Sequence, residues 1–189
     1  MKKVAVVFVI LGLVLMMGVP ASAQKPMKVG VNLSIVYPFG DLADVAKLGF
    51  GGGATFRYYY KDNIAIKGAL GYHMFGEKEE TISVTFPFFG TISSTVKTKG
   101  TYLPLYVGAD YFLAAKGKMT PYVSGLLGYY LGQGDFKDNN LGIAPGAGII
   151  YDLGKYKLDA NAVLNYVMSD PSGMYFGINV GLVFDLPQK

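Results

Sequence analysis

The sequence predicts an all-β fold, an eight-stranded antiparallel up-and-down transmembrane β-barrel. From Met27 onward, apolar residues recur at every second position, which is typical of strands with two different faces. Turn-forming residues interrupt this alternation at intervals that leave eight strand-length segments. One face of these segments is apolar throughout, whereas the other is rich in glycine and holds the charges. The three observations together predict a closed sheet whose apolar face points outward.

The composition excludes several classes of protein. The 189 residues are 51% hydrophobic and 16% charged, which does not fit a disordered chain. The absence of cysteine excludes disulfides, thiolate metal sites and cysteine nucleophiles. The net charge of +4 includes Lys2 and Lys3, so the rest of the chain is nearly balanced. We therefore expect no nucleic-acid partner.

The first element is predicted to be an export signal peptide at residues 1–23. Lys2 and Lys3 precede an uninterrupted apolar stretch, 4–17, and the small residues Ala21-Ser22-Ala23 follow it. A stretch of this length as a helix is too short to cross a bilayer core of about 30 Å. We expect cleavage after Ala23, which leaves residues 24–189 as one outer-membrane β-barrel domain.

Eight strands follow in order. The last one shows the pattern most plainly, because its even-numbered residues from Phe176 to Phe184 are all large and apolar while Gly177, Asn179 and Gly181 lie between them. The predicted strands are 27–37, 50–60, 64–75, 101–112, 122–131, 142–152, 158–168 and 174–184.

The connections alternate in length. Those after even-numbered strands are short, and those after odd-numbered strands tend to be longer, as in a barrel with tight periplasmic turns and larger outer loops. The short joints are 61–63, 114–119 and 153–156; the others are 38–49, 76–100, 132–141 and 169–173. In the first loop, Asp41 is expected to cap a helical turn over 42–47.

The faces decide between a soluble and a membrane barrel. No position of the apolar face carries a charged, amide or hydroxyl-bearing Ser or Thr side chain, whereas ten positions of the other face are glycine. The lumen of an eight-stranded barrel is just wide enough for side chains to fill, so it cannot hold the whole set of bulky residues. The apolar face is therefore predicted to face lipid.

Aromatic residues gather near the ends of the strands, as expected for two interfacial girdles. One group is Tyr60, Tyr111, Tyr151 and Phe184, and the other is Tyr37, Tyr72, Tyr129, Tyr166 and Phe176.

The chain resembles the small outer-membrane β-barrel family that includes the OmpA transmembrane domain and OmpX. The resemblance rests on Gly71-Tyr72, Gly128-Tyr129-Tyr130, the segment 121–125 and the final strand from Tyr175 to Phe184. It implies a location in the cell outer membrane, contact with outer-membrane lipids including lipopolysaccharide, and a structural or adhesion-like role without catalysis. No cofactor is implied, and we expect a monomer.

Six charged residues on the inward face lie nearer the periplasmic end and are expected to form a neutral ion-pair cluster that fills the lower lumen, because charges in a confined space persist when they are paired. They are Lys28, Arg57, Lys67, Asp110, Asp152 and Asp159. The alternative is a ring that lines a narrow, porin-like solute conduit. Planar-bilayer recordings distinguish the two.

His73, the single histidine, raises a further alternative. A lipid-modifying outer-membrane enzyme needs a histidine with a nearby serine and carboxylate. Phe75 occupies the position two residues after His73, where a His-x-Ser pair would have its serine. We therefore predict a hydrogen-bonded lining residue and no enzyme.

The segment 76–100 keeps the alternating pattern and is expected to be a hairpin that extends beyond the bilayer. Phe86, Phe88 and Phe89 at its tip are the candidate contact with an extracellular surface partner or with lipid headgroups. The other possibility is that these rings pack over the barrel mouth.

Overall fold

The computed structural model describes residues 26–86, 90–115, 117–170 and 172–186. The predicted signal peptide, 1–23, lies outside the described residues. Within them, no helix is long and apolar enough to cross a membrane.

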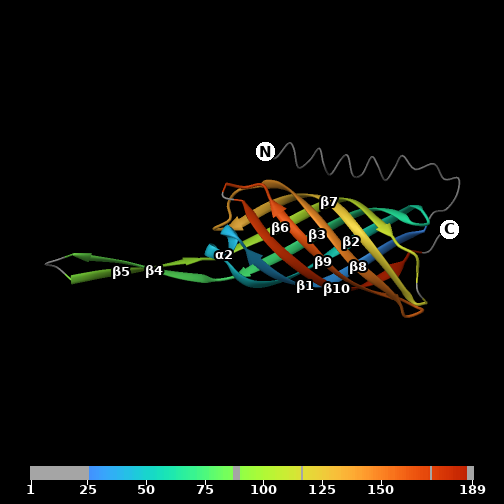
Figure 1. Cartoon of the computed structure of the whole chain (residues 1–189), viewed down its shortest axis with the longest axis horizontal. Helices are drawn as coiled ribbons and strands as arrows, with labels where there is room; N and C mark the ends of the chain where they lie inside the picture. The colour runs from blue at the N-terminus through green and yellow to red at the C-terminus, as the bar shows by residue number, and fades with distance from the viewer. Residues whose placement is uncertain (1–25, 87–89, 116, 171, 187–189) are drawn as a thin grey trace.

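Eight antiparallel strands close into a barrel in the order β1-β10-β9-β8-β7-β6-β3-β2 (Figure 1). A separate two-stranded sheet, β4–β5, is inserted between β3 and β6. The barrel strands are β1 (Met27–Phe39), β2 (Lys47–Lys61), β3 (Ile64–Gly76), β6 (Gly100–Phe112), β7 (Met119–Gly134), β8 (Asn140–Asp152), β9 (Lys157–Val167) and β10 (Gly173–Asp185).

All eight predicted strands are present, so the predicted fold class is confirmed. The observed strands extend past several predicted ends, most of all β7, which begins three residues earlier and ends three later than predicted. Its pairing explains the extension, because Met119 still faces Tyr151 of β8 and Gly134 still faces Gly100 of β6.

The outward side chains are the apolar ones. Leu33 is 78% exposed and Leu127 is 64% exposed, whereas their chain neighbours Ser34 and Leu126 are buried. The aromatic residues of both predicted girdles are outward, with Tyr37 paired to Phe176 across the β1–β10 seam. This surface matches the hydrocarbon and interface of a bilayer.

The two ends of the barrel differ. The turns between β2 and β3, β6 and β7, and β8 and β9 lie at the end where β1 begins and β10 stops. From the other end, β4 (Lys78–Phe86) and β5 (Gly90–Thr98) project far along the long axis of the molecule (Figure 1). The predicted outer hairpin is therefore present as a two-stranded ribbon.

The helical turn of the first loop, α2, spans Asp41–Val45 and contributes the buried Leu42 to the barrel mouth. The prediction that Asp41 caps it was wrong. Gly40 is the N-cap, with φ of 60°, and no side chain caps the helix. Glycine adopts this left-handed backbone at no steric cost, which moves the start of the helix to Asp41.

Candidate functional site

An arginine held between two carboxylates occupies the part of the lumen nearer the end where β1 begins, since Arg57 lies opposite Lys28. Arg57 of β2 donates a hydrogen bond of 2.7 Å from Nε to Oδ2 of Asp110 on β6, and one of 2.7 Å from Nη2 to Oδ2 of Asp159 on β9. Arg57 is 1% exposed. Strands that do not pair with one another are thus joined through the interior by charge-assisted hydrogen bonds, which are stronger than those between neutral groups. Only β3 separates β2 from β6, whereas β9 lies farther around the barrel.

Tyr122 and Lys67 complete this charged cluster. The Tyr122 hydroxyl accepts a hydrogen bond of 3.1 Å from Arg57 Nη2 and donates one of 2.7 Å to Asp159 Oδ1. Lys67 Nζ lies 3.6 Å from Asp110 Oδ1. Two cations therefore face two carboxylates, and the cluster is formally neutral. We call Arg57, Lys67, Asp110, Tyr122 and Asp159 the lumen cluster.

Two of the six predicted charges lie elsewhere. Lys28 Nζ is 3.2 Å from Asp185 Oδ1, and Lys157 binds the same carboxylate through Oδ2. The closing register places Lys28 opposite Asp185, which draws this lysine to the end of the barrel. Asp152 accepts a hydrogen bond of 2.7 Å from the Gly154 amide in the β8–β9 turn. The structure thus brings four of the six charges together.

Below the lumen cluster, towards the turns, the barrel opens into a cavity of about 340 Å³. Its apolar wall includes Phe112 and Ile150, which belong to a small buried cluster with Ala65 and Tyr122. Lys28, Asp152 and Lys157 also line it. This cavity is the mouth of the barrel at the end with the short turns, and the lumen cluster separates it from the rest of the lumen.

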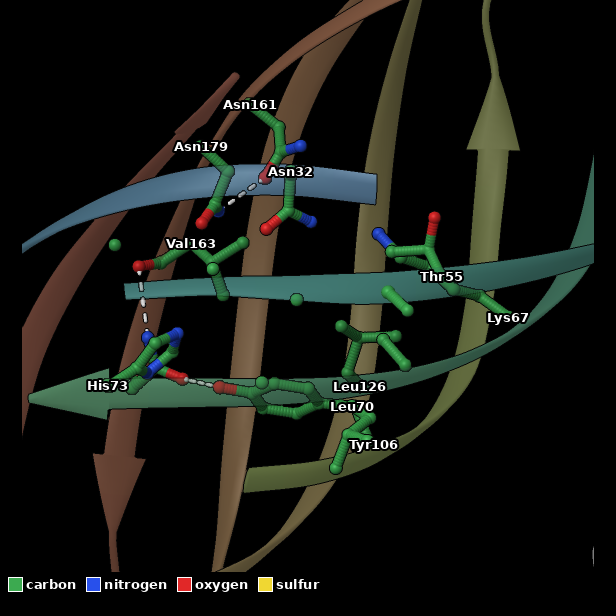
Figure 2. A pocket seen from close by; sticks show the side chains of 17 residues that line it. Asn32, Thr55, Lys67, Leu70, His73, Tyr106, Leu126, Asn161, Val163 and Asn179 are labelled. Carbon is green, nitrogen blue, oxygen red and sulfur yellow. Dashed lines mark hydrogen bonds between the residues drawn. The ribbon is translucent and has the colours of Figure 1, made fainter. Parts of the chain in front are cut away.

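Above the lumen cluster lies a second, much smaller cavity of about 50 Å³, lined by asparagine side chains (Figure 2). Ser34 Oγ donates a hydrogen bond of 2.6 Å to Asn179 Oδ1, and Asn179 Nδ2 donates one of 2.8 Å to Asn161 Oδ1. Asn165 accepts a further hydrogen bond of 2.6 Å from the Tyr106 hydroxyl. A space of this size holds a few water molecules and no larger solute.

The outer mouth is closed by aromatic rings. Tyr102, Tyr130 and Tyr175 are at most 5% exposed and form one cluster with Phe75 and Leu42 of α2. Their ring centroids lie about 5 to 7 Å apart, in the range of favourable aromatic contact. We call this group the aromatic plug. The lumen is therefore obstructed at two levels.

His73 lies against the aromatic plug. Its Nδ1 is 3.0 Å from the Tyr175 hydroxyl, and its ring packs edge-on against that phenol. The partner that the structure gives this histidine is a buried tyrosine, not the serine and carboxylate of a nucleophilic site. Among the described residues, no group of three or more histidine or acidic side chains could hold a metal ion.

The projecting hairpin has one polar face. At its base, Lys97 bridges Glu79 and Glu77, the latter at 3.2 Å. The hydrogen bond from Lys97 and its positive charge lower the pKa of Glu79, and the two glutamates raise the pKa of Lys97. Farther out, cross-strand hydroxyl pairs follow, with Ser83 Oγ 2.8 Å from Ser93 Oγ.

Two of the three candidate contact residues at the hairpin tip lie beyond what the structure describes. Phe88 and Phe89 fall outside the described residues, and Phe86 is placed only as the last residue of β4.

Sequence reasoning assigned neither Tyr122 to the hydrogen bonds of the lumen cluster nor Lys157 and Asp185 to an ion pair. Tyr122 stands at the first position of its predicted strand, Lys157 just before one and Asp185 just after one. The registers of β10 with its two neighbours bring the ion pair together, because Lys28 of β1 lies opposite Asp185 and Lys157 of β9 lies opposite Val183, two residues before it. Charged residues next to predicted strand ends are a sequence signal for such pairs.

Comparisons with known proteins agree with this architecture. The model of the outer membrane protein beta-barrel domain family matches residues 9–184. Neisserial surface protein A has a similar structure, with a TM-score of 0.64 and 12% identity over 84% of this chain and 96% of that one. The Yersinia pestis outer membrane protein Ail, in a nanodisc, has a TM-score of 0.52 and 14% identity, over 86% of this chain and 100% of that one. These likenesses concern the fold. A comparison with curated proteins finds no match.

Proposed function

Because the chain belongs to the outer membrane protein beta-barrel domain family, we propose that it is a closed barrel of the cell outer membrane whose β4–β5 hairpin makes contacts at the cell surface. Its location in the outer membrane follows from the family and from the outer-membrane proteins that share its fold. The finer role, structural or adhesive, is our proposal.

The obstructed lumen supports a role without transport. The lumen cluster joins β2, β6 and β9 across the interior, and the aromatic plug fills the outer mouth. The cavity between them, about 50 Å³, does not give passage to a solute. We therefore favour a filled barrel over a narrow porin-like conduit, and steady open channels in planar bilayers would contradict this part of the proposal.

The projecting hairpin carries the surface role. It adds nothing to the closure of the barrel, because β3 pairs directly with β6 beneath it. A long ribbon that the barrel does not need for closure is well placed to meet a partner. The neighbour Ail is described as an attachment invasion locus protein, which agrees with such a role but concerns that protein.

We propose no catalytic activity. The buried hydrogen bond between His73 and Tyr175 supports a lining role for the histidine. The alternative, a lipid-modifying enzyme, predicts a change in the mass of lipid A that disappears with His73→Ala. We expect no such change.

The test of the surface role removes the hairpin. Replacing residues 77–98 with an Asn-Gly turn should leave β3 and β6 paired, because this dipeptide favours tight antiparallel connections. We expect the variant to keep the heat-modifiable gel migration of a folded barrel and to lose attachment of the expressing cells to surfaces. Unchanged attachment at equal surface levels would overturn the surface role and leave the closed barrel in place.

A further inference from the structure

The hairpin carries charges only at its base. The acidic and basic side chains of 77–80 and of Lys97 and Lys99 flank a stretch of 16 residues, 81–96, in which none is charged. Within the base, Lys97 is already paired with Glu77 and Glu79. A partner that meets the outer part of the ribbon is therefore not recognised through ionic pairing.

One face of this uncharged stretch is lined with hydroxyl groups. Thr81 lies opposite Thr95 and Ser83 opposite Ser93, with Oγ–Oγ distances of 3.4 and 2.8 Å. All four residues are exposed. We call Thr81, Ser83, Ser93 and Thr95 the hydroxyl face.

The hydroxyl face retains free hydrogen-bonding capacity. Each hydroxyl has one proton to donate and two lone pairs, so a bond within a pair leaves one donor and several acceptors directed at the surroundings. Successive pairs are about 7 Å apart, since residues two apart on a strand share a face. Such a flat, neutral array of donors and acceptors is complementary to a polyhydroxylated partner such as a saccharide.

The position of the hairpin indicates where that partner is found. β4 begins two residues after β3 ends, and the ribbon runs outward along the barrel axis (Figure 1). Nine strand residues span about 30 Å. In an outer membrane, the phosphates of lipopolysaccharide lie next to the acyl chains and its sugars lie farther out. We therefore expect the charged base to lie level with the phosphates and the hydroxyl face to lie farther out, level with the sugars.

We propose that the hydroxyl face binds neutral sugars of the lipopolysaccharide that surrounds the barrel. This inference deepens the proposed surface role and rests on it, because it names the chemistry that the hairpin contacts. Hydroxyl-to-hydroxyl bonding without charge predicts affinity that is insensitive to salt, unlike the binding of sulfated or phosphorylated chains.

The experiment uses the full chain folded in phospholipid nanodiscs that contain no lipopolysaccharide. The probe is a neutral O-polysaccharide released from lipopolysaccharide by mild acid, titrated by calorimetry at low and at high NaCl. The test variant combines Thr81→Val, Ser83→Ala, Ser93→Ala and Thr95→Val, which removes the hydroxyls and keeps strand-forming side chains. Val96→Thr, on the opposite face of the ribbon, is the matched control.

We expect the wild type and the Val96→Thr control to bind equally at both salt concentrations. The fourfold variant should lose about tenfold or more in affinity, since each net hydrogen bond contributes modestly and the variant removes the free donor and the acceptors of both pairs. Absence of binding by the wild type, equal binding by the fourfold variant, or loss of binding in high salt would each overturn the inference.

The outcomes separate this inference from the proposed function. Loss of cell attachment on deleting 77–98, together with equal sugar binding by the fourfold variant, refutes the sugar site alone. Self-association of nanodiscs through the hairpin, detected as paired discs by sedimentation, would assign the face to a second copy and also refute it.

Discussion

Arg57 and Asp110 are joined across the barrel interior by a hydrogen bond of 2.7 Å between Nε and Oδ2, and both residues are at most 1% exposed. The same guanidinium holds Asp159 at 2.7 Å. A buried charge is tolerated only when its counter-charges are held against it. We therefore expect the loss of any one charged residue of the lumen cluster to destabilise the remaining ones.

Removing Arg57 should therefore strongly destabilise the barrel. In Arg57→Met, Asp110 keeps only the contact with Lys67, and Asp159 loses its ion pair. We expect a loss of about 3–5 kcal/mol in the free energy of unfolding. Urea titration in phospholipid vesicles measures it through the heat-modifiable gel shift, because the chain has no tryptophan to report by fluorescence. Lys118→Met, on an exposed turn, is the control and should stay near wild type.

Adding one methyl group at Gly148 should disturb the same cluster. A Cβ there would lie 2.7 Å from the Tyr122 hydroxyl oxygen and 2.6 Å from the Asn161 Cβ. Tyr122 would have to move from Asp159, so Gly148→Ala should cost about 1–3 kcal/mol of stability. Gly125→Ala places its methyl in open space on the outer surface and should leave stability unchanged or slightly higher. Equal effects of the two changes would contradict this packing.

Charges on the outward face should be costly near the middle of the bilayer. Val180 is half exposed in the central part of β10, and Val180→Arg is expected to cost about 2–4 kcal/mol in the free energy of unfolding in vesicles. Leu105→Arg on β6 should behave similarly. Leu153→Arg lies in the β8–β9 turn and should cost at most about 1 kcal/mol. A neutral result at Val180 would contradict the outward orientation.

Pairing of the hairpin base should depend on pH. The pKa of Glu79 is lowered below 4.5 by Lys97, so the contribution of the ion pair is complete above that value and is lost as pH falls through the lowered pKa. The pKa of Lys97 is raised above 10.5, so the contribution is lost at the alkaline end as pH rises through the raised pKa. Nuclear magnetic resonance of the base of the hairpin should show loosening on acidification from pH 6 to pH 3.

The control for this pH dependence is Glu79→Gln combined with Glu77→Gln. It removes both carboxylates that contact Lys97. If the double variant loosens with acid as much as the wild type does, another group is responsible.

Strand positions and faces could be predicted from the sequence, because a period of two and the turn residues are local signals. Alternation assigns Val180 to the apolar face, the narrow lumen assigns that face outward, and Val180 is indeed half exposed. Ion-pair partners could not be predicted in the same way. They depend on the stagger between strands that are distant in sequence, which alternation does not encode.

Lys28 illustrates this. Alternation assigns it to the interior, but only the register between β1 and β10 reveals that Asp185 is its neighbour. The tyrosines of the aromatic plug give a second example. The sequence assigns Tyr175 to the inward face, but its contact with His73 depends on the position of β10 relative to β3.

The seam between β1 and β10 also governs how the chain can reach its native state. Lys28 lies opposite Asp185, 157 positions away. The edge of β1 that faces away from β2 therefore has no backbone hydrogen-bond partner until β10 is in place. Until then the growing sheet has two open edges that invite pairing with other chains. Contacts so distant in sequence also make for slow folding. Assembly of this barrel should therefore depend on chaperones or assembly factors that shield those edges and bring β1 and β10 together.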